Sequence, residues 1–205
     1  MSLSVSSSAS ASVPSSISPL IRSLAARISL GDVRPAADTQ RRAAVAVVLH
    51  DEPSPRVLLM KRAERDGDPW SGHISLPGGG YQASDGDLRV TAIRETQEEL
   101  GIELDGTCLL GNLAPLQPSS GSRSIEITPF VFVTRAALEP VCGPEAVAAF
   151  WLPLDQAASG ALDSTYIYPA SQHAFPSWSY EGHVIWGLTW RILGLVLELG
   201  RQGVP

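Results

Sequence analysis

Short apolar runs separated by turn residues fill the middle of the chain. Ala43–His50 and Val57–Arg62 are rich in β-branched residues and leucine, and Asp51–Pro55 lies between them with two prolines. Runs of this kind, bounded by turn residues, predict two strands joined by a turn. Further strands are predicted at Gly72–Leu76, at Ile125–Val133 and, from a weaker pattern, at Phe150–Leu154.

Three segments have the apolar spacing of helices. Asp87–Leu100 ends at Gly101, and Ser84 and Asp87 stand at capping-box spacing, so we expect this helix to begin near residue 85. Pro19–Leu30 is a second candidate, and Val184–Leu199 is apolar almost all round. The last segment is too short for a membrane span and has Arg191 in its interior, so it predicts a buried or dimer-facing helix. Strands, helix, strands and helix in this order indicate a mixed α/β layer fold.

Length and composition indicate one globular domain. The chain has 205 residues, of which 44% are hydrophobic, enough for a sizeable core. Residues 1–18 are Ser/Ala-rich and uncharged and predict a disordered tail, which leaves 19–205 as a single domain. An organelle transit peptide would share the tail's features, but a tail with a docking helix on a cytoplasmic protein is the preferred interpretation. Cys108 and Cys142 are too few for a disulfide scaffold and are interpreted as small buried hydrophobes.

Charge is unevenly distributed along the chain. The net charge is −6, and Asp85–Asp105 alone carries seven acidic residues against Arg89 and Arg94. Nucleic-acid binding is therefore not expected, because it needs clustered cations. The stretch around Arg62, just upstream, is cationic. A cationic strand followed by an acidic helix suggests a phosphorylated ligand held with a metal.

Three glutamates share one face of the acidic helix. At 100° per residue, Glu95, Glu98 and Glu99 fall within about a third of its circumference. Like charges at this spacing destabilise a helix by a few tenths of a kcal/mol per pair, unless a cation occupies the face. Oxygen ligands suit Mg²⁺ or Mn²⁺. A solvated acidic face is the alternative, and taken alone the motif favours it.

The loop in front of this helix favours a metal site over a solvated acidic face. Pro77 is followed by Gly78, Gly79 and Gly80, which permit a close approach of the main chain to a ligand. Gly79, five residues, Asp85, eight residues and then Arg-Glu-Thr-Gln-Glu-Glu-Leu-Gly-Ile at 94–102 resemble the Nudix box. The family pattern has Glu where Asp85 stands, one residue fewer before the Arg-Glu, and an apolar residue at Thr96.

The resemblance implies a fold, an activity and a set of residue roles. The fold would be a mixed sheet sandwiched between helices, and the activity hydrolysis of a nucleoside diphosphate derivative. Glu95, Glu98 and Glu99 would bind Mg²⁺ or Mn²⁺, and Arg94 would pair with a glutamate and hold the helix geometry. Glu98 or a further carboxylate, Glu145, would be the general base. A surface loop acid is the alternative for Glu145.

The upstream residues resemble the coenzyme A pyrophosphatase branch of that family. Leu58–Ala63 and then Gly72–Gly79 are similar to its signature, with Met60 and Leu76 in place of Thr and Phe. The second Arg of that signature has no counterpart at the expected place, where Gly67 or Asp68 stands, and Arg65 is the candidate substitute. The implied substrate is coenzyme A or acyl-CoA, cleaved to 3′,5′-ADP and 4′-phosphopantetheine. Candidate substrate-binding residues are Arg62, Arg65, His73, Gly78, Gly79 and Gly80.

Other interpretations fit several of these residues. Arg62 is equally well a surface strand arginine, and the Trp186–Arg191 segment, also similar to that branch, is more simply explained by helix packing. Other pyrophosphates such as ADP-ribose, NADH or dinucleoside polyphosphates are possible substrates. A Nudix-fold binding module without turnover is the non-enzymatic alternative, although such modules usually lack the carboxylates that this chain keeps. A homodimer is possible.

Overall fold

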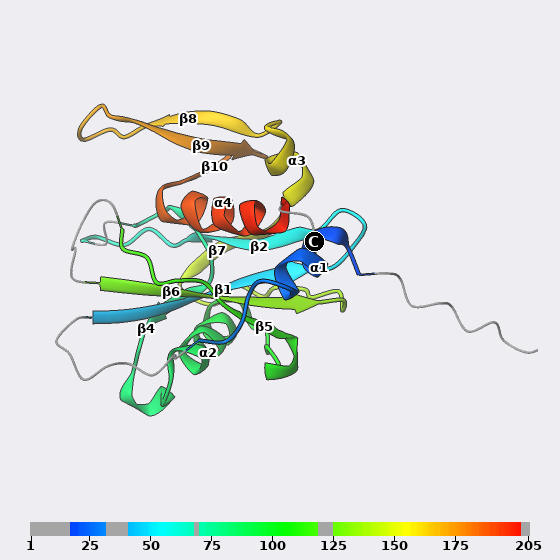
Figure 1. Ribbon diagram of the computed structural model, residues 1–205. Coiled ribbons are helices and arrows are strands. Elements are labelled where there is room, and N and C mark those ends of the chain that lie inside the picture. Colours follow the sequence, from blue (N-terminus) through cyan, green and yellow to red (C-terminus); the bar gives the residue numbers. More distant parts are fainter. Residues whose placement is uncertain (1–16, 32–40, 68–69, 119–124, 202–205) are drawn as a thin grey trace, which may run out of the picture.

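A mixed β-sheet forms the centre of the computed structural model, which describes residues 17–31, 41–67, 70–118 and 125–201 (Figure 1). Within these ranges, seven strands make one sheet with the order β3-β2-β1-β6-β5, while β4 pairs with β1 and β7 with β2. The strands are β1 (Arg41–His50), β2 (Arg56–Arg62), β3 (Ile74–Ser75), β4 (Gly78–Gly80), β5 (Leu109–Asn112), β6 (Ile125–Thr134) and β7 (Ala146–Pro153). The predicted tail falls almost entirely on residues 1–16, outside the described residues.

Strand β1 is buried on both sides, because each face of the sheet carries its own apolar core. It runs parallel to β6 and antiparallel to β2 across the predicted turn, where Leu49 pairs with Val57. Ala46 and Val48 belong to one core, and Val47 and Leu49 to the other. This alternation is the period-2 pattern of a strand, here apolar on both faces.

Helix α2 (Leu88–Leu100) covers one face of the sheet. Asp87 is its N-cap and accepts from the amide of Val90, and Gly101 closes it in the left-handed conformation at φ 64°. The expected capping box at Ser84 and Asp87 is wrong. A 3₁₀ turn, η1 (Ala83–Asp85), precedes α2 instead, and the reciprocal cap lies on that turn, between Gln82 and Asp85.

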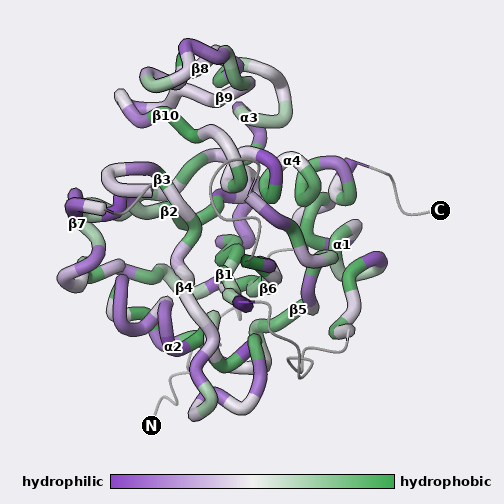
Figure 2. Tube along the Cα trace, turned by 90° about the vertical axis from the view of Figure 1, so that its left-hand side faces the viewer, coloured by the Kyte–Doolittle hydropathy of each residue, from purple (hydrophilic) through white to green (hydrophobic). Residues whose placement is uncertain are grey.

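The opposite face is covered by α1 (Pro19–Ala25) and α4 (Gly187–Arg201). A second sheet of β8 (Asp163–Ile167), β9 (Ala174–Tyr180) and β10 (His183–Trp186) packs on the far side of α4, and α3 (Leu154–Ser159) leads into it. Figures 1 and 2 show α4 between the two sheets. This sandwiched position explains why its sequence is apolar almost all round.

The expected helix over Val184–Leu199 begins too early. Val184–Trp186 belongs to β10, which pairs antiparallel with β9, and the helix starts only at Gly187, where φ is 63°. An apolar run gives the same signal in a buried strand as in a buried helix, so the pattern did not separate them. No helix in the described part of the chain is long and apolar enough to cross a membrane.

The cysteine interpretation is also wrong. Cys142 is exposed in the loop before β7, and Cys108 is only half-buried at the end of the 3₁₀ turn η2 (Gly106–Cys108). Neither packs as a core residue.

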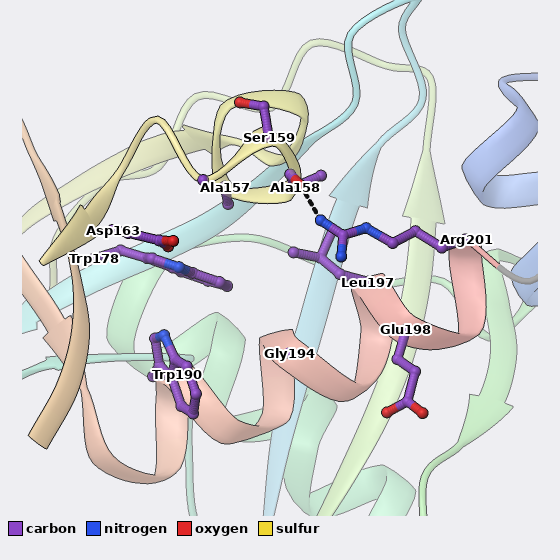
Figure 3. A pocket seen from close by; sticks show the side chains of 11 residues that line it. Ala157, Ala158, Ser159, Asp163, Trp178, Trp190, Gly194, Leu197, Glu198 and Arg201 are labelled. Atoms are coloured by element: carbon purple, nitrogen blue, oxygen red, sulfur yellow. Dashed lines mark hydrogen bonds between the residues drawn. The ribbon is translucent and has the colours of Figure 1, made fainter.

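A hollow of about 580 Å³ lies between α3, the second sheet and α4 (Figure 3). Trp178 and Trp190 line it with ring centroids 6.1 Å apart, and Arg201 at the end of α4 donates to the carbonyl of Ala158. The hydrogen bond fastens the end of α4 to α3. The residues that line this hollow include none of the candidate site residues.

Candidate active site

The three consecutive glycines form a strand, not the expected loop. Strand β4 pairs antiparallel with β1, and the Gly78 amide points to α2. A Cβ atom on Gly78, at φ 154°, would collide with the Ala44 carbonyl, and one on Gly79 would stand 2.5 Å from the Glu95 carboxylate. Glycine therefore lets the α2 carboxylates approach the backbone of β4.

Glu99 is the buried carboxylate of the site. It is 1% exposed, and its Oε2 accepts from the Gly78 amide at 2.8 Å. Arg62 Nη1 lies 3.9 Å from its other oxygen. Burial raises the pKa of Glu99 to about 8, the Gly78 hydrogen bond opposes this, and the negative charge of Glu95 adds to it. Burial likewise raises the pKa of Glu95.

Arg94 ties the acidic helix to the turn before it. Its Nε donates to Asp85 Oδ1 at 2.8 Å and its Nη2 to Asp85 Oδ2 at 3.1 Å. Its Nη1 lies 2.9 Å from Glu95 Oε1 and 3.0 Å from Glu98 Oε2, and Nη2 also donates to the Gly80 carbonyl at 3.2 Å. The bidentate pair lowers the pKa of Asp85 to about 2 and raises that of Arg94.

The three glutamates lie near one another with different partners. Glu95 and Glu98 contact Arg94, Glu99 contacts the Gly78 amide, and only Glu98 has a largely exposed side chain. In the described ranges, no group of three or more His, Cys, Asp or Glu side chains is arranged to hold a metal ion. Metal binding would thus require the carboxylates to exchange their present partners.

Glu145 lies close to this cluster in space. Its negative charge contributes to the raised pKa values of Glu95 and Glu99, after the larger effect of burial. Its carboxylate stands 3.2 Å from Arg65 Nη1, and its carbonyl accepts from the amide of Ala63. The candidate Arg65 is therefore paired with the candidate Glu145.

A cavity of about 770 Å³ joins most of the candidate residues. Those that line it are Arg62, His73, Gly78, Gly79, Gly80, Arg94, Glu95, Glu98 and Glu145. Glu99 and Arg65 are not part of the lining, but each contacts a residue that is.

The cavity also has aromatic lining residues that the sequence analysis did not select as site residues. Tyr168, Phe175 and Trp186 come from the second sheet and its hairpin. Trp186 had been interpreted as helix packing, whereas it lines the cavity, and its ring lies beside that of His73, with centroids 5.1 Å apart. The resemblance of Trp186–Arg191 to the coenzyme A branch was a signal for Trp186, but apolar periodicity gave none, because the second sheet folds back on the site from nearly a hundred residues away.

Comparison with known proteins identifies the arrangement. The NUDIX domain model matches residues 40–171, which hold β1, the glycine strand, α2 and Glu145. The chain belongs to the Nudix family.

Nudix relatives cover most of the chain. The uncharacterized Nudix hydrolase NudL of Yersinia pestis (strain Pestoides F) is 36% identical over 159 residues, which cover 76% of this chain and 77% of the relative. A NUDIX hydrolase structure from Alicyclobacillus acidocaldarius aligns with a TM-score of 0.55 at 20% identity, over 82% of this chain and 95% of that one. These matches confirm the predicted family, hydrolase class and mixed fold.

A further structural neighbour is the bifunctional NMN adenylyltransferase/ADP ribose pyrophosphatase of Francisella tularensis, complexed with AMP and a Mn ion. The TM-score is 0.56 at 16% identity, over 83% of this chain and 43% of that longer protein. At this identity the likeness shows the fold alone.

Proposed function

We propose that this Nudix hydrolase cleaves the diphosphate linkage of a nucleoside diphosphate derivative in a Mg²⁺-dependent reaction, with coenzyme A or acyl-CoA as the substrate. One observation carries the proposal. Within a single cavity, the glycine strand, the cations Arg62 and Arg94, and the carboxylates Glu95, Glu98 and Glu145 line the same space.

The phosphate-binding groups come from β2 and β4. Arg62 ends β2 at the cavity wall, and its guanidinium lies 3.9 Å from buried Glu99. The Glu99 carboxylate holds this cation in place beside the glycine strand, where backbone approach is close. Arg62 therefore supplies positive charge to the phosphates, which carry most of the developing charge in phosphoryl transfer.

The residue types of the donor set fit a divalent cation, which would replace the present partners of the carboxylates. Burial raises the pKa values of Glu95 and Glu99. The negative charges of Glu98 and Glu145 add to the rise at Glu95, and those of Glu95 and Glu145 add to it at Glu99, so a cation would relieve the repulsion. Glu95, Glu98 and Glu99 would hold Mg²⁺ or Mn²⁺ through carboxylate oxygens. When bound, the ion supplies Lewis-acid charge to the bridging phosphates and lowers the pKa of a coordinated water.

The reaction needs a water molecule and a proton acceptor. A P–O bond forms to the water oxygen, the P–O bond to the bridging anhydride oxygen breaks, and the proton passes to a carboxylate oxygen of Glu98 or Glu145. Both carboxylates line the cavity, and each is oriented by an arginine, Arg94 or Arg65. With coenzyme A the products are 3′,5′-ADP and 4′-phosphopantetheine.

The Leu58–Ala63 and Gly72–Gly79 segments, which resemble the coenzyme A branch, support coenzyme A as the substrate. Both segments border the cavity, through Arg62 and His73. ADP-ribose is the second candidate. The Francisella neighbour, whose structure holds AMP and a Mn ion, is an ADP ribose pyrophosphatase with the same fold.

A panel of pyrophosphates, incubated with Mg²⁺ and followed by product identification, tests the proposal. Faster cleavage of coenzyme A than of ADP-ribose, NADH and dinucleoside polyphosphates, with 3′,5′-ADP as a product, is expected. Faster cleavage of any other member refutes the coenzyme A assignment. Binding without turnover of any member refutes the hydrolase function of this site.

A further inference from the structure

One wall of the cavity is aromatic. His73, Phe175 and Tyr168 surround Trp186, with ring centroids 5.1, 5.4 and 5.7 Å from the Trp186 ring. All four side chains line the cavity, and the three from the second sheet and its hairpin are only partly buried. Part of the ring surface thus faces the space that also contains the glycine strand and the carboxylates.

Local hydrogen bonds hold this wall in place. The amide of Tyr168 donates to the His173 carbonyl at 2.9 Å, and the Tyr168 carbonyl accepts from Gln172 at 2.8 Å, so the hairpin between β8 and β9 is closed at Tyr168. Immediately after Trp186, the Thr189 hydroxyl donates to the Ile74 carbonyl of β3 at 3.2 Å. The backbone that carries the wall is therefore fixed to the strand that leads into β4, so a ligand has little backbone ordering to induce.

We propose that this wall binds the nucleobase of the substrate and selects nucleotides over diphosphates that lack a base. The inference rests on the proposed function, since it places the base relative to a diphosphate at the glycine strand. A cavity with arginines, carboxylates and glycine backbone in one part and rings in the other matches a ligand with a charged diphosphate and a planar ring. Every base has a π-face, and stacking on aromatic side chains stabilises it.

Two tyrosines of the hairpin form a matched pair for the test. Tyr166 and Tyr168 are two residues apart, both half-buried, and both contact Trp186, at centroid distances of 4.4 and 5.7 Å. Tyr168 lines the cavity, whereas Tyr166 is not among the lining residues. If the aromatic cluster has a purely structural role, substitution of either tyrosine should affect nucleotide binding equally. If the cluster binds the base, substitution of Tyr168 should have the larger effect.

The experiment measures the dissociation constants of AMP and ribose 5-phosphate by calorimetry in the presence of Mg²⁺. The two probes differ by the adenine, so the ratio of their constants reports the contribution of the base. We expect the wild-type protein to favour AMP by about tenfold or more. Tyr168→Leu should reduce the ratio at least ~5-fold, while Tyr166→Leu and Tyr168→Phe should preserve it. Phe175→Leu provides the same test if Tyr168→Leu does not fold.

A wild-type ratio near one, an unchanged ratio in Tyr168→Leu, or an equal fall in Tyr166→Leu would overturn the inference. The pyrophosphate panel separates this failure from that of the proposed function. Turnover with a ratio near one refutes the base-binding wall alone. A high ratio that depends on Tyr168, without hydrolysis of any diphosphate, refutes the proposed function alone.

Discussion

Arg94 and Asp85 form a two-point ion pair, with Nε 2.8 Å from Oδ1 and Nη2 3.1 Å from Oδ2. The pair explains how this chain accommodates an aspartate and one extra residue in its Nudix box. The 3₁₀ turn Ala83–Asp85 folds the shorter carboxylate back over α2, where Thr91 also donates to it at 2.8 Å. Arg94 is thereby oriented toward Glu95 and Glu98.

Asp85→Asn should destabilise the protein in a pH-dependent way. The folded-state pKa of Asp85 is lowered from 3.8 to about 2, so its stabilisation is present above pH 4 and is lost as the pH falls toward 2. The shift corresponds to a difference in unfolding free energy of about 2 kcal/mol at pH 7, which should fall by about half at pH 3. Urea unfolding of both proteins at several pH values measures it.

The control for that experiment is Asp66→Asn, a substitution of an exposed acid outside the site. It should leave the unfolding free energy within about 0.5 kcal/mol of wild type at each pH. A difference between wild type and Asp85→Asn that stays constant from pH 7 to pH 3 would contradict the role of the ion pair.

Gly79→Ala should impair catalysis with little effect on folding. The new Cβ would stand 2.5 Å from the Glu95 carboxylate, which is the mobile end of a side chain and can move aside. Displacement of this carboxylate should lower kcat on the order of 100-fold. Gly106→Ala is the control, because its Cβ would meet no atom within 4 Å and the residue is not part of the cavity lining. Steady-state kinetics should show near-normal turnover for the control, and equal losses in both variants would argue against the steric mechanism.

Glu98→Gln should remove turnover and preserve the fold. The side chain is largely exposed, at 59%, so the amide can replace the carboxylate without a core penalty. If Glu98 is a metal ligand or the proton acceptor, its loss should lower kcat ~100-fold or more. Thermal melting checks the fold. Retention of activity within about tenfold of wild type, on the same scale, would show that the role assigned to this glutamate is wrong.

Gly143→Ala should shift the loop that carries Glu145. A Cβ on Gly143 would overlap the backbone carbonyl of Glu98, and the Gly143 amide donates to the Glu99 carbonyl at 2.8 Å. Since backbone must move, a loss of about 1–3 kcal/mol in unfolding free energy is expected, together with lower kcat. Gly106→Ala, where a Cβ meets nothing within 4 Å, is the control. Wild-type stability for Gly143→Ala would contradict the close packing of this loop on α2.

Sequence patterns predicted the parts of the fold that depend on local spacing. The strands β1, β2 and β6 and helix α2 were placed within a few residues, because their apolar periodicity and the Gly101 stop lie in the elements themselves. The glutamate cluster followed from helical spacing and the Nudix resemblance. The assignment of metal and catalytic roles to its members stays a prediction.

Sequence patterns missed the second sheet and the aromatic wall. Strand β9 contains Pro176, which usually argues against a strand, and most residues of β8 are exposed, so neither has a clear apolar alternation. Trp186 reaches the cavity through pairing with β9 and the return of the chain onto β3. Such contacts depend on tertiary packing and leave no periodic signal in the sequence.

Electron paramagnetic resonance of Mn²⁺, titrated into the wild-type protein and into Glu98→Gln, tests the central claim most directly. If the carboxylates of α2 hold a divalent cation, the wild-type protein should bind Mn²⁺ with an affinity that Glu98→Gln weakens by about tenfold or more. Absence of Mn²⁺ binding to the wild-type protein, or equal affinity in the two proteins, would contradict the account.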